Sequence, residues 1–245
     1  MGVATTSGYW DALAGAALCG RRGSVLVLVS DERSHSISGF VRSHAKEISD
    51  GYIFGGPAAV SKATAKALGK ATFDKSLYKL YKDILVRAAN GTGEFSRWPK
   101  DKVSEDYKAE YTLHDIDQDG INELIVYNAS ASEAGKQCIV FTISNASVVN
   151  CGSFSMWHGN LRYLTNQSLY LSQWDPHGYR YITPIYLDET KLKLGKETSC
   201  KYEQGDTFES NMTRALRMAY GCGAVDAGSV SWTNTNDASR VNALV

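Results

Sequence analysis

The sequence predicts two successive fold classes: a short α/β segment with a parallel sheet, then a larger α+β domain that is mainly an antiparallel β meander with flanking helices. In residues 1–70, short apolar runs alternate with segments whose apolar residues recur every three or four positions. This alternation of strands and helices is typical of crossover units. From residue 107, short runs rich in β-branched and aromatic residues are separated by turn sequences, which predicts antiparallel strands. We place the domains at 1–72 and 73–245, with residues 69–72 as the hinge.

The first domain is expected to alternate strands and helices. Residues 3–5 begin it as an extended segment, and Ser7 is expected to cap a helix that reaches Leu18. The apolar run 24–29 does not alternate, so we expect a strand buried on both faces, and residues 52–54 are predicted as a second short buried strand. Further helices are predicted over 37–48 and 58–68.

The second domain is expected to begin with a helix whose apolar stripe runs from Leu77 to Ala88 and which ends at Asn90-Gly91. Another helix is predicted at 207–220. Strands are predicted at 111–115, 123–127, 138–143, 148–154, 161–164, 168–173, 179–187 and 191–202.

The bulk composition excludes some partners. The chain has 245 residues, and its 26 basic and 26 acidic residues cancel, so no global field exists to recruit nucleic acid or an anionic membrane. The longest apolar run is of strand length, far below the roughly 20 residues of a membrane span. Residues 1–18 lack the basic start of a secretion signal, so any signal is expected upstream.

The cysteines are too few for a disulfide scaffold, and their spacing fits no zinc site. Two interpretations remain open: all are buried small hydrophobic residues, or Cys138 and Cys151 form a disulfide across neighbouring strands. The five are Cys19, Cys138, Cys151, Cys200 and Cys222.

Two stretches carry a family resemblance. "VATTSGYWDALAGAALCGRRGSVLVLVSD" and "EISDGYIFGGPAAVSKATAKAL" resemble the bacterial type-two cell-wall-binding repeat over about residues 3–69, with DALAG and YIFGGPAAVS the most specific words. The resemblance implies an extracellular protein held non-covalently on anionic polymers of the Gram-positive wall, together with other modules of its kind. The family's leading strand and first helix are missing before Met1, so the resemblance implies a partial module.

Four arginines of this segment are candidates for contact with an anionic wall polymer, because the guanidinium fork suits phosphate oxygens. The alternative is that each is ordinary solvated surface. The four are Arg21, Arg22, Arg33 and Arg42.

The stretch 115–124, DIDQDGINEL, has carboxylates at positions one, three and five, glycine at six and an acid at nine. Such a loop can wrap one hard cation, and calcium is the cofactor it predicts. It lacks the glutamate at position twelve of an EF-hand and resembles the DxDxDG loops of integrin-type β-repeat domains. That resemblance implies as ligands the side chains of Asp115, Asp117, Asp119 and Glu123 and the carbonyl of Ile121. An acid-rich turn that holds no ion is the alternative.

The second half also resembles a poorly characterised β-rich domain of secreted Gram-positive proteins. "YTLHDIDQDGINELIVYN" and "LYLSQWDPHGYRYITPIYLDETKL" carry this likeness. It supports an extracellular location and implies no particular activity.

The sequence predicts no catalytic residue. None of the five histidines stands in HExxH or beside a GxSxG serine. The alternative is a wall-polymer or glycan hydrolase that uses Asp115, Asp117 or Glu123. Such an enzyme needs two carboxyls facing each other across a cleft at about 5–9.5 Å, whereas acids two residues apart on one loop converge on a point.

Aromatic residues gather near predicted strand ends in the second domain. Such rings can stack on sugars, although they also cover sheet edges and cores. The candidate glycan contacts are Trp157, His158, Trp174 and Tyr179.

Overall fold

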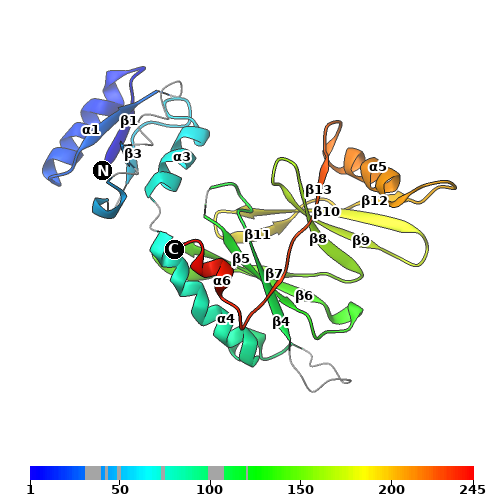
Figure 1. Ribbon diagram of the computed structural model, residues 1–245. Helices are drawn as coiled ribbons and strands as arrows, with labels where there is room; N and C mark the ends of the chain where they lie inside the picture. The colour runs from blue at the N-terminus through cyan, green and yellow to red at the C-terminus, as the bar shows by residue number, and fades with distance from the viewer. Residues whose placement is uncertain (31–39, 42–43, 49–50, 73–74, 99–107, 120) are drawn as a thin grey trace. The chain divides into compact units, whose positions relative to one another are not determined.

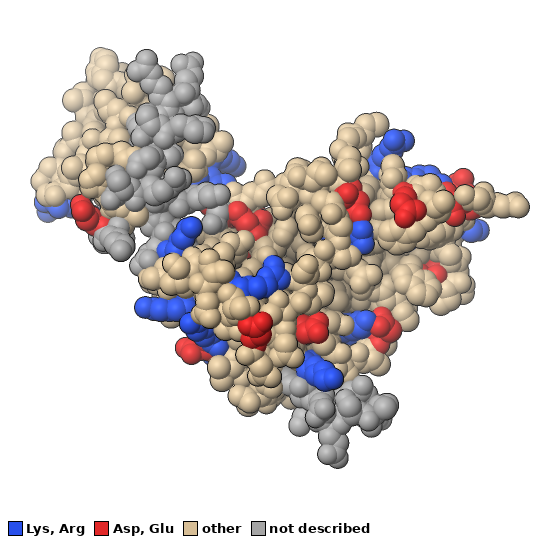
Figure 2. All heavy atoms as spheres, in the orientation of Figure 1, with Lys and Arg blue, Asp and Glu red and all other residues tan. Residues whose placement is uncertain are grey.

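The computed structural model describes residues 1–30, 40–41, 44–48, 51–72, 75–98, 108–119 and 121–245. It divides into two compact units, Met1–Lys75 and Ser76–Val245 (Figure 1). Within these described ranges, no helix has the length and apolar character needed to cross a bilayer. On the face of the second unit seen in Figure 2, basic and acidic side chains are interspersed, in line with the balanced charge of the sequence.

The first unit contains the predicted parallel sheet. Its strand order is β2-β1-β3, and β1 pairs in parallel with both neighbours. All four residues of the central strand are buried. The elements of this unit are β1 (Gly2–Thr5), α1 (Tyr9–Arg21), β2 (Leu26–Val29), the 3-10 turn η2 (Ala45–Glu47), β3 (Tyr52–Ile53) and α3 (Lys62–Thr72).

Burial of the outer strands differs from the prediction. Leu28 in β2 is 47% exposed, so the expectation that 24–29 is buried on both faces is wrong. Both residues of β3 are exposed, so the prediction of a buried strand at 52–54 is also wrong. The physical reason is position, because β2 and β3 are the edge strands of a three-stranded sheet and only β1 has a strand on each side.

The helix starts also differ. Gly8, not Ser7, is the N-cap of α1 and supplies no side-chain hydrogen bond; the Ser7 N–H donates to Thr5 Oγ1 at 3.0 Å. The helix predicted over 58–68 begins at Lys62, because the Oγ of Ser61 accepts the Thr64 N–H at 3.2 Å and caps it there.

The helix predicted over 37–48 falls partly outside the described residues. Within its described part, Val41 is fully buried among the apolar residues of this unit. Residues 45–47 form a 3-10 turn rather than a continued α-helix.

The second unit begins with helical turns. A 3-10 segment, η3 (Lys75–Leu80), leads into α4 (Tyr81–Asn90), which buries Tyr81, Ile84, Leu85 and Ala88. Gly91 ends α4 with φ of 60°, so the predicted stop at Asn90-Gly91 is confirmed; glycine adopts this left-handed conformation without strain. A further 3-10 turn, η4 (Gly93–Phe95), follows.

The predicted meander forms two antiparallel sheets rather than one. The first has the order β14-β4-β5-β6-β7, and the second has the order β11-β10-β9-β8-β13 with β12 also on β10. The strands of the first are β4 (Ala109–His114), β5 (Glu123–Asn128), β6 (Gln137–Ser144), β7 (Ser147–Ser155) and β14 (Thr233–Asn234). Those of the second are β8 (Gly159–Leu164), β9 (Leu169–Trp174), β10 (Tyr179–Asp188), β11 (Lys191–Leu194), β12 (Thr198–Lys201) and β13 (Asp226–Ser229).

A shared apolar cluster lies between the two sheets. Ile125 and Val140 of the first sheet pack in it with Leu161, Leu171 and Ile185 of the second. The chain changes sheet after β7, where the turn before β8 places His158 at φ 42°. Burying one face of each sheet against the other removes more apolar area from water than one open meander would.

The other face of the second sheet is covered by α5 (Phe208–Tyr220). Thr207 and Ser210 form a capping box at its start. Met212, Ala215 and Leu216 of α5 pack with Tyr170 and Ile182 of the sheet. Figure 1 shows α5 in orange beside β12 and β10.

Three elements near the C-terminus were not predicted, nor was the division of one predicted strand into two. Strands β13 and β14 add one strand to each sheet, and α6 (Ser239–Asn242) follows them. The strand predicted at 191–202 is two strands, β11 and β12, which both pair with β10.

All five cysteines are free thiols. Cys138 is fully buried, and burial raises its thiol pKa; burial likewise raises the pKa of Cys151 to about 11. Four cysteines are therefore buried hydrophobic residues, as the first interpretation expects, whereas Cys222 is exposed.

For two glycines of α1 we predict opposite effects on stability when each is replaced by alanine. A methyl group on Gly15, the glycine of DALAG, would lie 2.6 Å from Cδ2 of Phe54, whereas one on Gly20 meets no atom within 4 Å. We expect Gly15→Ala to destabilise the first unit by about 1–3 kcal/mol through overpacking. The matched Gly20→Ala should stabilise α1 by up to about 1 kcal/mol. Thermal unfolding measures both, and equal effects of the two changes would contradict the packing role of Gly15.

Candidate functional site

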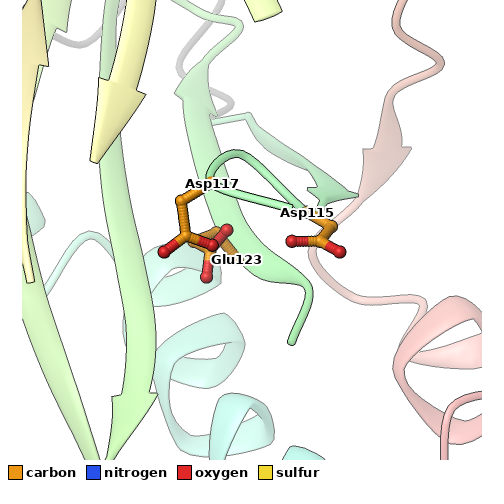
Figure 3. Close-up of side chains that lie close together, drawn as sticks. All are labelled: Asp115, Asp117 and Glu123. Carbon is orange, nitrogen blue, oxygen red and sulfur yellow. The ribbon is translucent and has the colours of Figure 1, made fainter. Parts of the chain in front are cut away.

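The acidic loop joins β4 to β5 in the first sheet of the second unit. His114, the last residue of β4, pairs with Glu123, the first residue of β5, and the loop connects these two residues. Asp115, Asp117 and Glu123 each place a carboxylate oxygen within 4.8 Å of the others. Figure 3 shows the Asp117 and Glu123 carboxylates close together, with that of Asp115 on the same loop. Three carboxylates from one hairpin thus converge.

Glu123 is the buried member of this group, with 1% of its surface exposed. Its Oε2 accepts the Ile116 N–H at 2.8 Å, and its Oε1 accepts the Thr142 hydroxyl at 2.9 Å. Burial raises the pKa of Glu123 to about 9, and the charges of Asp117 and Asp119 act in the same direction. When Glu123 is ionised, its carboxylate therefore accepts hydrogen bonds from two neutral donors, the Ile116 N–H and the Thr142 hydroxyl.

The remaining loop bonds are local. Asp117 Oδ1 accepts the Asp119 N–H at 3.1 Å, and Asp119 Oδ1 accepts the Ile121 N–H at 2.7 Å. These are the side-chain turns that Asp favours. Gly120 lies outside the described residues, and Asp119 is not a member of the converging group.

Two tyrosines hold the closing end of the loop. The Tyr78 hydroxyl accepts the Asn122 N–H at 2.7 Å, and the Tyr81 hydroxyl donates to the Asn122 carbonyl at 3.0 Å. Burial raises the pKa of both phenols. Sequence reasoning placed Tyr81 in an apolar stripe and did not single out Tyr78. It missed both hydroxyl contacts, because only the fold brings this helical segment to the loop.

Two of the four candidate wall-binding arginines lie among the described residues. Arg21 and Arg22 are exposed at the C-terminal end of α1. The Arg22 guanidinium donates to the Tyr52 hydroxyl and lies 4.9 Å from the centroid of that ring. Arg33 and Arg42 lie outside the described residues.

The candidate glycan contacts form two groups. Trp157, His158 and Trp174 are a row of rings, with centroids 4.8 Å apart for the first pair and 5.7 Å for the second. Trp174 and Tyr179 line a pocket of about 490 Å³. Trp157 and His158 are not among the described residues that line it. Four other members of this pocket, Arg162, Arg180, Tyr202 and Phe208, were missed by sequence reasoning.

One signal for the pocket was present in the sequence. Arg180 and Ile182 are two positions apart in the same strand, so they lie on one face. An arginine on an inward face is rarely buried without a specific role.

A small parallel sheet with helices in the crossovers defines the first unit as an α/β module. Residues 1–65 match the family model of cell wall binding domain 2. The resemblance of the first segment is thereby confirmed, and the likeness of the second domain stays a prediction. Comparisons with curated proteins and with solved structures gave no significant match.

The environment of Glu123 predicts the effect of one substitution. Thr142→Val keeps the shape of the side chain and removes its hydroxyl donor to Glu123. We expect a loss of about 1–3 kcal/mol of unfolding free energy, because a buried acceptor loses its partner. Thr165→Val, at an exposed turn residue after β8, is the control, with an expected change within about 0.5 kcal/mol. Denaturant unfolding measures both, and a Thr142→Val protein as stable as the parent would refute this role.

Proposed function

We propose that the protein is a non-catalytic, extracellular surface protein attached non-covalently to the Gram-positive cell wall. The observation that carries this proposal is the match of residues 1–65 to cell wall binding domain 2. The parallel sheet and the buried central strand of the first unit are consistent with such a module.

The surface of the first unit supports contact with an anionic polymer and with companion modules. Arg21 and Arg22 present exposed guanidinium groups, which suit phosphate oxygens. Tyr9, Trp10 and Leu13 of α1 are 61%, 71% and 59% exposed. An apolar cluster on a helix face is typical of a surface that another domain covers, and we assign it to other wall-binding modules.

Wall attachment through charge predicts a dependence on salt. The full chain should sediment with purified Gram-positive walls, and the bound fraction should fall as ionic strength rises from about 0.1 M to about 1 M, where the Debye length shortens from about 10 Å to about 3 Å. Arg21→Gln/Arg22→Gln should reduce binding at low salt, and Lys191→Gln/Lys193→Gln in the second unit should not. A chain that stays in the supernatant at low salt would defeat the proposal.

For the second unit we propose a binding or presenting module whose acidic loop takes up calcium. Three carboxylate oxygens within 4.8 Å of one another repel when ionised. A hard divalent cation removes this repulsion, and oxygen is the ligand type that calcium prefers. Asp115, Asp117 and Glu123 would provide the charged ligands. Asp119 and the Ile121 carbonyl complete the proposed set.

Calcium binding predicts a gain in stability. Calcium at about 100 times its Kd should add about 2.7 kcal/mol to the unfolding free energy, because the ion binds only the folded chain. Asp117→Asn should abolish most of this gain, whereas Asp188→Asn, an exposed acid on β10, should retain it. Melting curves with millimolar calcium and with a chelator measure the effect. An unchanged melting temperature of the parent protein would favour the acid-rich turn instead.

A wall-polymer hydrolase is the alternative function, and the geometry gives it less support. The loop carboxylates converge on one point instead of facing each other across a cleft. In the pocket, Asp175 is the one carboxylate among the described lining residues. Its oxygens accept the N–H groups of His177 and Tyr179 and the hydroxyl of Tyr181. These bonds indicate a carboxylate that shapes a turn.

A further inference from the structure

The 490 Å³ pocket lies on the face of the second sheet that α5 covers. Its size falls within the range of about 300–1,000 Å³ typical of small-molecule sites. Its walls come from β8, from the end of β9 and the start of β10, from Tyr202 after β12 and from Phe208 at the start of α5. Three stretches of the chain, 160–162, 172–180 and 202–208, therefore build it, and all belong to the second unit.

A buried cation forms part of the pocket wall. Arg180 is 4% exposed. Its guanidinium donates to Asn211 Oδ1 at 2.8 Å, to Ser172 Oγ at 2.9 Å and to the Tyr202 hydroxyl. All three partners are neutral, and they use three of the five N–H donors of a guanidinium.

The charge of Arg180 has no acidic partner within ion-pair distance among the residues that the structure describes. The Phe208 ring lies 4.3 Å from its guanidinium carbon, and a ring face compensates a cation only in part. A buried charge without a counter-ion is costly. Two donors and one positive charge thus remain for an anionic ligand.

The second arginine of the pocket is already neutralised. Arg162 forms an ion pair with Asp226, in which its Nε lies 3.1 Å from Asp226 Oδ1, and it donates to the Ser229 hydroxyl at 2.8 Å. Asp175 adds a negative charge to the lining. A ligand with a single negative charge therefore suits the pocket better than a dianion such as a phosphate monoester.

The rest of the lining favours a ring with an apolar face. Trp174 is 52% and Phe208 is 46% exposed, although both are large aromatic residues. Trp174 is the cross-strand neighbour of Arg180, so the indole and the guanidinium lie side by side on one face of the sheet. Aromatic faces carry negative potential, which attracts the C–H groups of a sugar ring.

A second hollow of about 410 Å³ adjoins the first. The two share Arg162 and Phe208, and the second continues along α5 past Arg217. A ligand longer than one ring can thus extend from one hollow into the other.

We propose that this pocket binds a monocarboxylated sugar residue of the uronic-acid type within an oligosaccharide, with its carboxylate on Arg180 and its ring on Trp174 and Phe208. The inference rests on the proposed binding role of the second unit and gives that role a ligand class. It does not depend on wall attachment through the first unit or on calcium.

Calorimetric titration of the full chain tests the proposal, with a uronic-acid oligosaccharide as the probe and the corresponding neutral oligosaccharide as the comparison. The acidic probe should bind at least about tenfold more tightly, because a hydrogen-bonded charge pair distinguishes the two. Trp174→Ala and Phe208→Ala should each weaken binding about three- to tenfold. Both side chains are half exposed, so their removal leaves the core intact.

One control variant and one conservative change complete the design. Tyr186→Ala removes an exposed ring on the same strand and face as Arg180 but outside the pocket. This variant should bind like the parent. Arg180→Lys keeps the charge and loses the fork, so it should weaken the acidic probe more than the neutral one.

Absence of binding at millimolar probe, equal binding of acidic and neutral probes, or equal losses in the pocket and control variants would each overturn the proposal. Uronic-acid polymers occur in two settings, bacterial walls and the glycans of other cells, and the two are distinguished by titrating fragments of each. Wall sedimentation of Trp174→Ala separates the claims. If the variant still sediments like the parent but binds the oligosaccharide more weakly, anchoring and ligand binding reside in different units.

Discussion

The apolar layer between the two antiparallel sheets is the constraint on which the second unit depends. Ile125 on one side and Leu171 and Ile185 on the other face into it, and successive residues of a strand point to opposite faces. A slip of one residue in any strand would expose its buried side chains. This register therefore also fixes where the polar side chains point, so the position of both sites follows from apolar packing.

Two buried polar groups lie on different layers of this unit. Glu123 shares a strand face with Ile125 between the sheets, and Arg180 shares a strand face with Ile182 beneath α5. Each is held by neutral donors or acceptors rather than by a direct opposite charge. A buried charge is stable only when compensated. The raised pKa of Glu123 lets a proton neutralise its carboxylate, and the proposed calcium would replace that proton. At Arg180 the proposed carboxylate ligand would supply the missing counter-charge.

The first unit follows a different rule, since its sheet is parallel and small. Only β1 is fully buried, whereas Leu28, Tyr52 and Ile53 on the edge strands are exposed. Apolar composition alone predicted burial for all three strands. A run of apolar residues indicates that a strand can be buried. Whether the strand is buried depends on whether it has a neighbouring strand on each side. The match to cell wall binding domain 2 supports the proposed wall attachment, and the exposed apolar residues of α1 support the proposed contact with companion modules.

The sequence by itself determined the parallel and antiparallel halves, most strand positions, the acidic loop and the family of the first segment, because all of these are local patterns of a few neighbouring residues. Only the tertiary structure decided that the meander divides into two facing sheets, that β13 and β14 return to complete them, and that Arg180 meets Trp174 and Phe208 in one pocket. These features depend on contacts between residues far apart in the chain. Such contacts are selected by the total apolar area buried, which no local pattern records.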